Sequence, residues 1–222
     1  MINVNDYKIK IIDLNTLKRR GVIKKVIGTL PREGLTVGLD VWARKSPKES
    51  FLGLIGICKT LTDKPLKVFV DDLCARMDTG RTVAEQKYYN NLYKKFFINQ
   101  GCEVYFSSDV LSEKQMARRI YNFSTRLTFN DFVQCLPLEK RVNIEKLSIK
   151  ECGHLILQLM FLDCIKDICD VAMFGAFSEA VVYMHRQTSN NPLSCVIVPK
   201  VPNNLTDIKE LLASLENKFT RK

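Results

Sequence analysis

Short runs of β-branched and aromatic residues alternate with longer segments of helical pattern along most of this chain. Five runs read as strands: residues 35–40 (LTVGLD), 66–71 (LKVFVD), 103–106 (EVYF), 170–175 (DVAMFG) and 195–199 (CVIVP). Such alternation is typical of a parallel sheet, because neighbouring parallel strands need long crossover connections that are usually helices. The sequence therefore predicts an α/β fold with a five-stranded parallel sheet and helices on both faces.

Local signals predict where several of the helices begin. The tetrapeptides SPKE, starting at Ser46, and TVAE, starting at Thr82, both match the capping box that opens a helix. Further helical patterns span residues 112–127, 128–141 and 147–166, and another begins at Thr206. The pattern over 147–166 is apolar on nearly all sides, which predicts a buried helix.

Length and charge limit the organisation and the partners of the chain. At 222 residues with 46% hydrophobic side chains, it fits a single domain over residues 1–222, with a basic lead-in at 1–30 and a C-terminal helix at 204–222. Its 34 Lys and Arg against 24 Asp and Glu give a formal charge of +10. That excess attracts polyanions such as RNA, DNA or acidic lipid, and by itself does not choose among them.

The cysteines and the N-terminal segment predict a cytoplasmic protein. Eight cysteines are scattered through mostly apolar stretches without a CxxC pair, so we expect reduced core residues rather than disulfides or a metal site. The N-terminus has no signal-peptide pattern, and no apolar run approaches the roughly 20 residues that span a bilayer. Neither a membrane partner nor a metal or cofactor is predicted.

Polar and small residues close several of the predicted strands. In open parallel sheets, ligands bind outside the carboxyl ends of the strands, where the strand order reverses. The candidates for a substrate pocket at that edge are Trp42, Asp71, Asp72 and Gly175, beside Asp40. These carboxylates suit a substrate ammonium group or a hard metal ion. The alternative is that one of them caps a helix while the others face solvent.

Three stretches together resemble one enzyme family over about residues 17 to 200. They are VGLDVWARKSPKESFLGLIGICKTLTDKPLKVFVDD, then FVDDLCARMDTGRTVAEQKYY, then RLTFNDFVQCL followed by GHLILQLMFLDCIKD and CDVAMFGAFSEAVVYM. The resemblance is to the tRNA-dependent cyclodipeptide synthases, which are related to the catalytic domain of class I tyrosyl- and tryptophanyl-tRNA synthetases. It implies a Rossmann-like, class I aminoacyl-tRNA synthetase-like domain. It also implies binding of aminoacylated tRNA and aminoacyl transfer without ATP.

Amino-acid activation is not expected. The His-x-Gly-His signature of tyrosyl-tRNA synthetases is replaced by FLGL at residues 51–54, and no Lys-Met-Ser-Lys-Ser loop follows. The groups that stabilise an adenylation transition state are therefore missing.

The positions that the resemblance marks as catalytic carry unusual residues. The nucleophile position falls on Asp40, the helical Tyr-x-x-x-Glu on His154 and Gln158, and the strand-end Tyr on Phe174. An Asp is a poor persistent acyl carrier, Gln158 does not titrate and Phe174 has no hydroxyl, unless Ser46 or Ser50 acts as a displaced nucleophile. The plain alternative for His154 and Gln158 is a satisfied buried pair.

Basic residues gather in the pattern over 112–127 and just after the next helix. The residues expected to contact tRNA are Lys114, Arg118, Arg119, Arg126, Lys140 and Arg141, with aromatic side chains interleaved. The alternative is an ordinary solvated face. His185 is expected at a surface helix terminus.

These observations lead to three candidate functions. The first is a cyclodipeptide synthase-like aminoacyltransferase, and the second is a tRNA-binding pseudoenzyme that has lost the nucleophile. The third is a magnesium-dependent nuclease that uses Asp40, Asp71, Asp72 and Asp170 as a carboxylate cluster.

Overall fold

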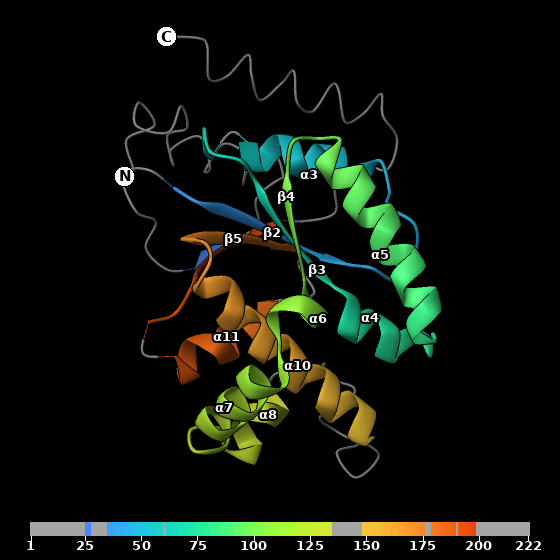
Figure 1. The fold of residues 1–222 in the computed structure, drawn as a ribbon. Coiled ribbons are helices and arrows are strands. Elements are labelled where there is room, and N and C mark those ends of the chain that lie inside the picture. The colour runs from blue at the N-terminus through green and yellow to red at the C-terminus, as the bar shows by residue number, and fades with distance from the viewer. Residues whose placement is uncertain are drawn as a thin grey trace, which may run out of the picture.

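The computed structural model describes residues 25–27, 35–59, 61–134, 148–175, 179–189 and 191–198. A six-stranded sheet with the order β1-β6-β5-β2-β3-β4 forms its centre (Figure 1). The strands are β1 (Lys25–Ile27), β2 (Val37–Trp42), β3 (Lys67–Asp71), β4 (Glu103–Phe106), β5 (Val171–Gly175) and β6 (Ser194–Val198).

The five predicted strands are confirmed, and all five are parallel. β2 lies between β3 and β5, with β4 and β6 outside them. The three-residue β1 joins β6 antiparallel at the edge and was not predicted. Because the chain proceeds outward through β3 and β4 and later returns beside β2 as β5, the strand order reverses between β2 and β5. The carboxyl ends of these two strands are where a ligand is expected.

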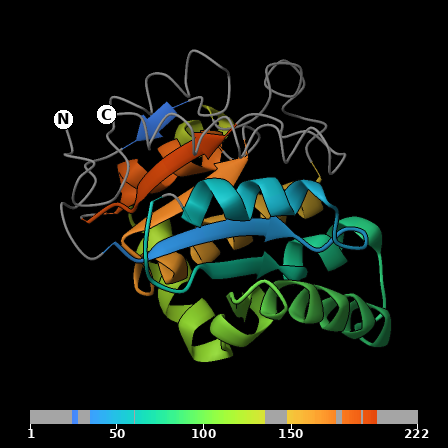
Figure 2. The ribbon, with the colours of Figure 1, turned by 90° about the horizontal axis from the view of Figure 1, so that it is seen from above.

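Helices cover both faces of the sheet (Figures 1 and 2). One face carries α3 (Ser50–Lys59) and α5 (Val83–Ile98), and the other carries α10 (Ile149–Lys166) and α11 (Glu179–Thr188). The shorter helices α4 (Asp72–Thr79), α6 (Ser107–Val110), α7 (Glu113–Ser124) and α8 (Phe129–Gln134) lie on the α10 side. Each face has its own apolar core, since alternate strand residues point to opposite faces.

The helix-start signals were right in two places and wrong in one. Thr82 forms the predicted capping box of α5 with Glu85, and Ser112 caps α7. Ser46 caps nothing, because the chain stays non-helical until α3 begins at Ser50. In the bent segment between β2 and α3, the Arg81 guanidinium donates to the carbonyl oxygens of Ala43, at 2.8 Å, and Arg44, which anchors the backbone ahead of Ser46.

The remaining helix predictions are confirmed in part. α10 lies within the predicted span 147–166 and opens with a capping box of Ser148 and Glu151. α7 ends at Ser124, short of residue 127, and α8 covers the first half of the span 128–141. The C-terminal helix at 204–222, the basic lead-in at 1–30 apart from Lys25–Ile27, and Lys140 with Arg141 lie outside the described residues.

Two composition-based expectations can be compared with the described part of the chain. Its seven cysteines are all free, and six of them are buried. Among the described helices, none combines the length and the apolar character that crossing a membrane requires.

Candidate functional site

The carboxyl ends of β2 and β3 bring several of the predicted site residues together. The register pairs Asp40 with Phe69 and Trp42 with Asp71. Since paired residues of parallel strands point to the same face, all four side chains project toward α10. We call Asp40, Trp42, Asp71 and His154 the polar cluster.

Asp40 is a carboxyl group in apolar surroundings. It is half-buried, and Phe69 and Phe174, both at most 1% exposed, belong to the same side of the sheet. Burial raises the pKa of Asp40 well above its usual range, and the negative charge of Asp71 raises it further, against a smaller opposing effect from the Val41 backbone N–H. Asp40 therefore keeps its proton to a higher pH than an exposed aspartate does.

Asp71 is held in place by one carboxylate oxygen while the other is free. Oδ1 accepts hydrogen bonds from the Cys74 backbone N–H at 3.0 Å, which caps α4, and from the Ser107 hydroxyl at 3.1 Å. Oδ2 is buried without a hydrogen-bond partner among the described residues. Burial raises the pKa of Asp71, and the bonds from Cys74 and Ser107 together with His154 only partly offset that effect.

His154 reaches the same place from α10. Its ring centroid lies 5.1 Å from that of Trp42, and its Nδ1 lies 3.5 Å from a carboxylate oxygen of Asp78. Its Nε2 is buried and, within the described part of the chain, has no hydrogen-bond partner. Buried polar groups are almost always paired, so two unpaired atoms in one cluster, this nitrogen and Asp71 Oδ2, mark a place suited to a ligand.

Two arginines that sequence reasoning did not single out shape the rim of the cluster. Arg44 stacks over the Trp42 ring at 4.2 Å and forms an ion pair with Asp78. Arg81 fixes the segment that follows β2 and lies 3.6 Å from the centroid of the Tyr89 ring. The GRT turn at residues 80–82 was the available signal for Arg81, whereas Arg44 had none.

Asp72 has a structural role, because hydrogen bonds occupy both of its carboxylate oxygens. Its Oδ1 accepts from the Ser107 hydroxyl at 2.8 Å and the Ser108 backbone N–H at 2.9 Å. Its Oδ2 accepts from the Asn90 side chain and the Ser108 hydroxyl, both at 2.7 Å. Asp72 thus ties the end of β3 to α6 and α5.

The other predicted residues are spread around the cluster. Gln158 is half-buried one turn after His154, and Phe174 is 1% exposed within the core. Gly175 ends β5 facing open space, with nothing within 4 Å of where a Cβ would stand.

The four-carboxylate arrangement of the nuclease hypothesis does not form. Asp170 precedes β5 and accepts the Thr36 backbone N–H at 2.8 Å, at the amino edge of the sheet. Asp71 ends the parallel strand β3 at the opposite edge. Across the described ranges, no three His, Cys, Asp or Glu side chains are grouped closely enough to hold a metal ion.

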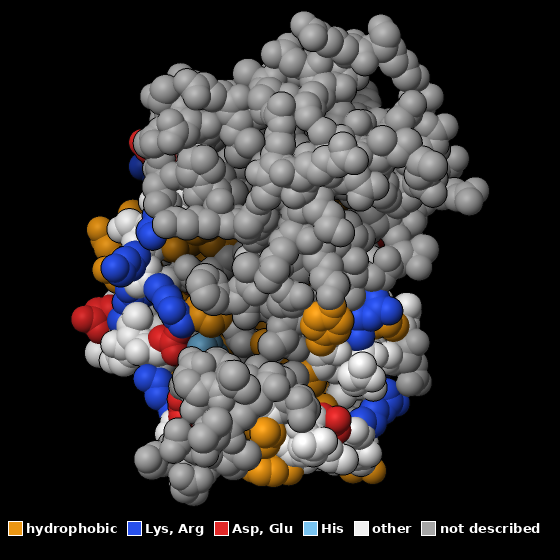
Figure 3. Space-filling view, turned by 180° about the vertical axis from the view of Figure 1, so that it is seen from behind, with side chains coloured by type: hydrophobic (Ala, Val, Ile, Leu, Met, Phe, Trp, Pro, Cys, Tyr) orange, Lys and Arg blue, Asp and Glu red, His pale blue; other side chains and the backbone are white. Residues whose placement is uncertain are grey.

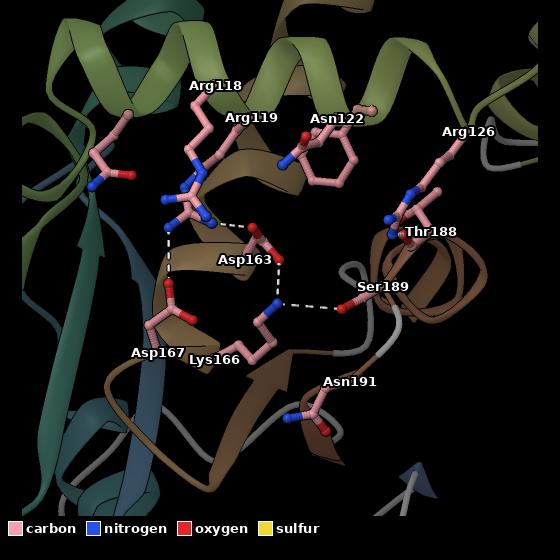
Figure 4. Close-up of a pocket in the computed structure, with 12 residues that line it drawn as sticks. Arg118, Arg119, Asn122, Arg126, Asp163, Lys166, Asp167, Thr188, Ser189 and Asn191 are labelled. Carbon is pink, nitrogen blue, oxygen red and sulfur yellow. Dashed lines mark hydrogen bonds and ion pairs between the residues drawn. The ribbon is translucent and has the colours of Figure 1, made fainter.

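The predicted tRNA-binding residues of α7 divide between surface and interior. Arg118 and Arg126 line a cavity of about 310 Å³ that α7 forms with the ends of α10 and α11 (Figure 4). Arg119 is only 8% exposed and forms ion pairs with Asp163 and Asp167, so it is not part of a solvated face. Lys114 is exposed outside this cavity.

His185 is another correction. It was expected at the surface but is fully buried, with Nε2 3.4 Å from Asp163 Oδ1. The last turn of α11 packs against α10, which its basic sequence did not reveal.

Comparison with known proteins identifies the fold. A tyrosyl-tRNA synthetase from Archaeoglobus fulgidus, solved with L-tyrosine, matches over 86% of this chain and 65% of its own, with a TM-score of 0.65 at 15% identity. The Aeropyrum pernix tyrosyl-tRNA synthetase matches over 75% and 53%, with a TM-score of 0.59 at 10% identity. The chain thus spans less than two thirds of the length of either synthetase. No protein-family model and no curated protein matches its sequence. The chain therefore has the Rossmann-like α/β fold of a class I tyrosyl-tRNA synthetase catalytic domain.

Proposed function

We propose that this chain binds the aminoacyl end of a charged tRNA at the polar cluster, with Asp40 and Asp71 holding the α-ammonium group. The observation that carries the proposal is the buried, unpaired Asp71 Oδ2 beside a second carboxyl group. A buried carboxylate oxygen without a partner is costly, and a cation that donates a hydrogen bond to it removes that cost. The synthetase-like fold and the net charge of +10 support tRNA as the carrier of that cation.

The cluster offers no activated nucleophile for an acyl-enzyme. Burial raises the pKa of the Cys74 thiol, and the nearby Asp71 charge raises it further. The Ser107 hydroxyl is engaged with Asp71 and Asp72, and it also accepts the Leu73 backbone N–H at 3.0 Å. Covalent capture of the aminoacyl group therefore has no support in these residues.

A second candidate function is direct aminoacyl transfer, as in a cyclodipeptide synthase-like enzyme without the covalent step. The raised pKa of Asp40 favours it, because such a carboxylate can take a proton from the α-ammonium of one aminoacyl ester. The freed amine then attacks the ester carbonyl of a second charged tRNA, and in a second step of the same kind the amine of the resulting dipeptidyl ester attacks the remaining ester, which closes the ring and releases the other tRNA. In each step the balance is the same. An amide bond forms, the ester C–O bond breaks, and the proton passes to the departing ribose oxygen.

The test of binding compares charged with deacylated tRNA by fluorescence anisotropy at two salt concentrations. The wild type is expected to prefer charged tRNA by about tenfold, the size of one charge-assisted hydrogen bond. Asp71→Asn removes that preference but leaves affinity for deacylated tRNA unchanged, since Asn is also a good N-cap for α4. Asp109→Asn makes the same charge change at an exposed site and is the matched control. Equal wild-type affinity for the two tRNAs contradicts the proposal.

Mass spectrometry of the medium of expressing cells tests transfer. A cyclic dipeptide made by the wild type and Ser46→Ala but absent with Asp40→Ala indicates transfer through Asp40. No product, together with a retained preference for charged tRNA, limits the protein to binding.

A further inference from the structure

The cavity between α7, α10 and α11 lies away from the polar cluster. His154 stands in the second turn of α10, whereas the cavity is lined by Asp163, Lys166 and Asp167 at its last turns. At 1.5 Å per residue, the two places are about 14 to 20 Å apart along the helix axis. A ligand bound in this cavity is therefore independent of the proposed aminoacyl site.

Basic side chains outnumber acidic ones in this cavity by four to two. The basic ones are Arg118, Arg119, Arg126 and Lys166, and the acidic ones are Asp163 and Asp167. In the space-filling view from behind, Lys and Arg side chains lie interspersed with Asp and Glu side chains over the described surface (Figure 3). The cavity thus carries an excess of two positive charges.

Both carboxylates in the cavity are already engaged. Asp163 accepts from Arg119 and from Lys166 at 2.7 Å, and Asp167 accepts from Arg119 at 3.0 Å. Burial acts to raise the pKa of Asp163, but His185, Lys166 and Arg119 outweigh it and hold that pKa below its usual range. The negative charges of Asp163 and Asp167 are therefore compensated inside the protein, and they repel an incoming anion only weakly.

Arg118 and Arg126 also line the cavity, Arg118 from α7 and Arg126 from the turn that follows it. Arg118 is exposed and makes no ion pair with the described residues, while Arg126 donates through Nη1 to the Thr188 carbonyl oxygen at 2.8 Å. Figure 4 shows Arg118 and Asn122 extending from α7 into the cavity, and Arg126, just after the end of α7, extending toward Thr188. The Arg126 contact also offsets the negative carbonyl end of α11.

We propose that this cavity binds a single nucleotide through its phosphate group, with Arg118 as the phosphate ligand and Arg126 lining the cavity beside it. Arginine presents a planar set of N–H donors that matches phosphate oxygens. The amide side chains of Asn122 and Asn191 supply hydrogen bonds for a base or a sugar. A volume of about 310 Å³ stands at the lower end of small-molecule sites and accommodates one nucleotide. A free nucleotide and one unpaired nucleotide of an RNA share this chemistry.

Titration calorimetry with the full chain tests the site, using AMP, inorganic phosphate and adenosine as probes. AMP and phosphate are expected to bind and adenosine, which lacks the phosphate, to bind at least about tenfold more weakly than AMP. Arg118→Glu lowers AMP affinity by about tenfold or more, whereas Lys114→Glu, the same charge change one turn away and outside the cavity, leaves it within about twofold. Asn122→Trp keeps the charge but fills the cavity, and it also abolishes AMP binding. Circular dichroism confirms that each variant is folded.

A parallel titration with deacylated tRNA distinguishes the source of the phosphate. If AMP does not bind but tRNA affinity falls in Arg118→Glu and Asn122→Trp and not in Lys114→Glu, the occupant is a nucleotide of RNA. The proposal is overturned if neither AMP nor tRNA binds in a way that depends on Arg118. It is equally overturned if Lys114→Glu and Arg118→Glu weaken binding alike, because the effect is then diffuse charge.

Discussion

Asp40 and Asp163 are two partly buried carboxyl groups whose surroundings shift their pKa values in opposite directions. Asp40 meets apolar side chains and a second carboxylate, so its pKa rises. Asp163 is also partly withdrawn from water, yet Arg119, Lys166 and His185 surround it, so its pKa falls. The first arrangement weakens the fold at neutral pH and favours a cationic ligand; the second stabilises the fold.

Asp40→Asn is expected to stabilise the protein at neutral pH. A carboxyl group whose pKa is raised on folding contributes stability below its ordinary pKa of about 4, and that contribution is lost as the pH rises through the folded-state value. At pH near 7, the variant should gain about 1 to 3 kcal/mol in its free energy of unfolding, the usual cost of withdrawing a polar group from water. The gain should shrink as the pH approaches about 4.

Urea unfolding of wild type and Asp40→Asn across this pH range makes the measurement, with Asp109→Asn as the exposed control. A variant that is less stable at every pH would show instead that the ionised Asp40 carboxylate makes stabilising bonds in the folded chain.

Gly38→Ala is expected to destabilise the protein. Gly38 is the second residue of β2, and an added Cβ there would stand 2.7 Å from the Phe69 ring and 2.9 Å from the Cys169 sulfur. Both neighbours are buried and have no free direction in which to move, so the expected loss is about 1 to 3 kcal/mol in thermal or urea unfolding. Gly175→Ala, with nothing within 4 Å of its Cβ, is the control and should be nearly neutral. Equal effects at the two positions would contradict the close approach of Phe69.

At the scale of elements, the sequence predicted what depends on neighbours along the chain. The five strands could be found because each is a short apolar run bounded by turn or loop residues, as expected for strands buried on both faces. β1 could not, because three residues in a basic segment carry almost no pattern. Thr82 and Ser46 carry equally good capping signals, but only Thr82 lies where the tertiary structure lets a helix begin.

Thr82→Ala is expected to cost about 1 kcal/mol of stability, because the capping box of α5 loses the side chain that accepts from Glu85 N–H. Ser46→Ala, which removes an identical sequence signal from an exposed loop residue, should change stability by less than about 0.5 kcal/mol. Chemical denaturation of the two variants side by side makes the comparison. A loss at Ser46 as large as that at Thr82 would mean that α3 begins earlier than Ser50.

The candidate site could be predicted only where strand ends define it. Asp40, Trp42 and Asp71 were found because residues closing neighbouring parallel strands must meet at one edge. His154 came from its place on a helix through the resemblance to a known family. Arg44, Arg81 and the cavity between α7, α10 and α11 were missed, since their positions depend on how separate elements pack, and local sequence does not encode that.

For the whole molecule, α10 joins two different environments. Its second turn brings His154 to the polar cluster, and its last turns carry Asp163, which faces Arg119 of α7 and His185 of α11. Asp163 therefore holds α7, α10 and α11, three of the helices on this side of the sheet, together through one carboxylate. Changes there should be felt as global stability rather than as a local defect.

Asp163→Asn is expected to destabilise the whole molecule at neutral pH by about 3 kcal/mol, since it leaves the largely buried Arg119 with one exposed partner, Asp167. A carboxylate whose pKa is depressed on folding contributes stability above its ordinary pKa of about 4 and loses that contribution as the pH falls through the folded-state value. The wild type should therefore lose more free energy of unfolding than Asp163→Asn between pH of about 5 and 2.

Asp167→Asn is the matched control, because its side chain is 59% exposed and exposed ion pairs contribute about 1 kcal/mol or less. If the two variants unfold alike at pH near 7, Asp163 is not the group that joins α7, α10 and α11. The contrast between Asp40, whose replacement is expected to stabilise the protein, and Asp163, whose replacement is expected to destabilise it, would then not follow from their surroundings.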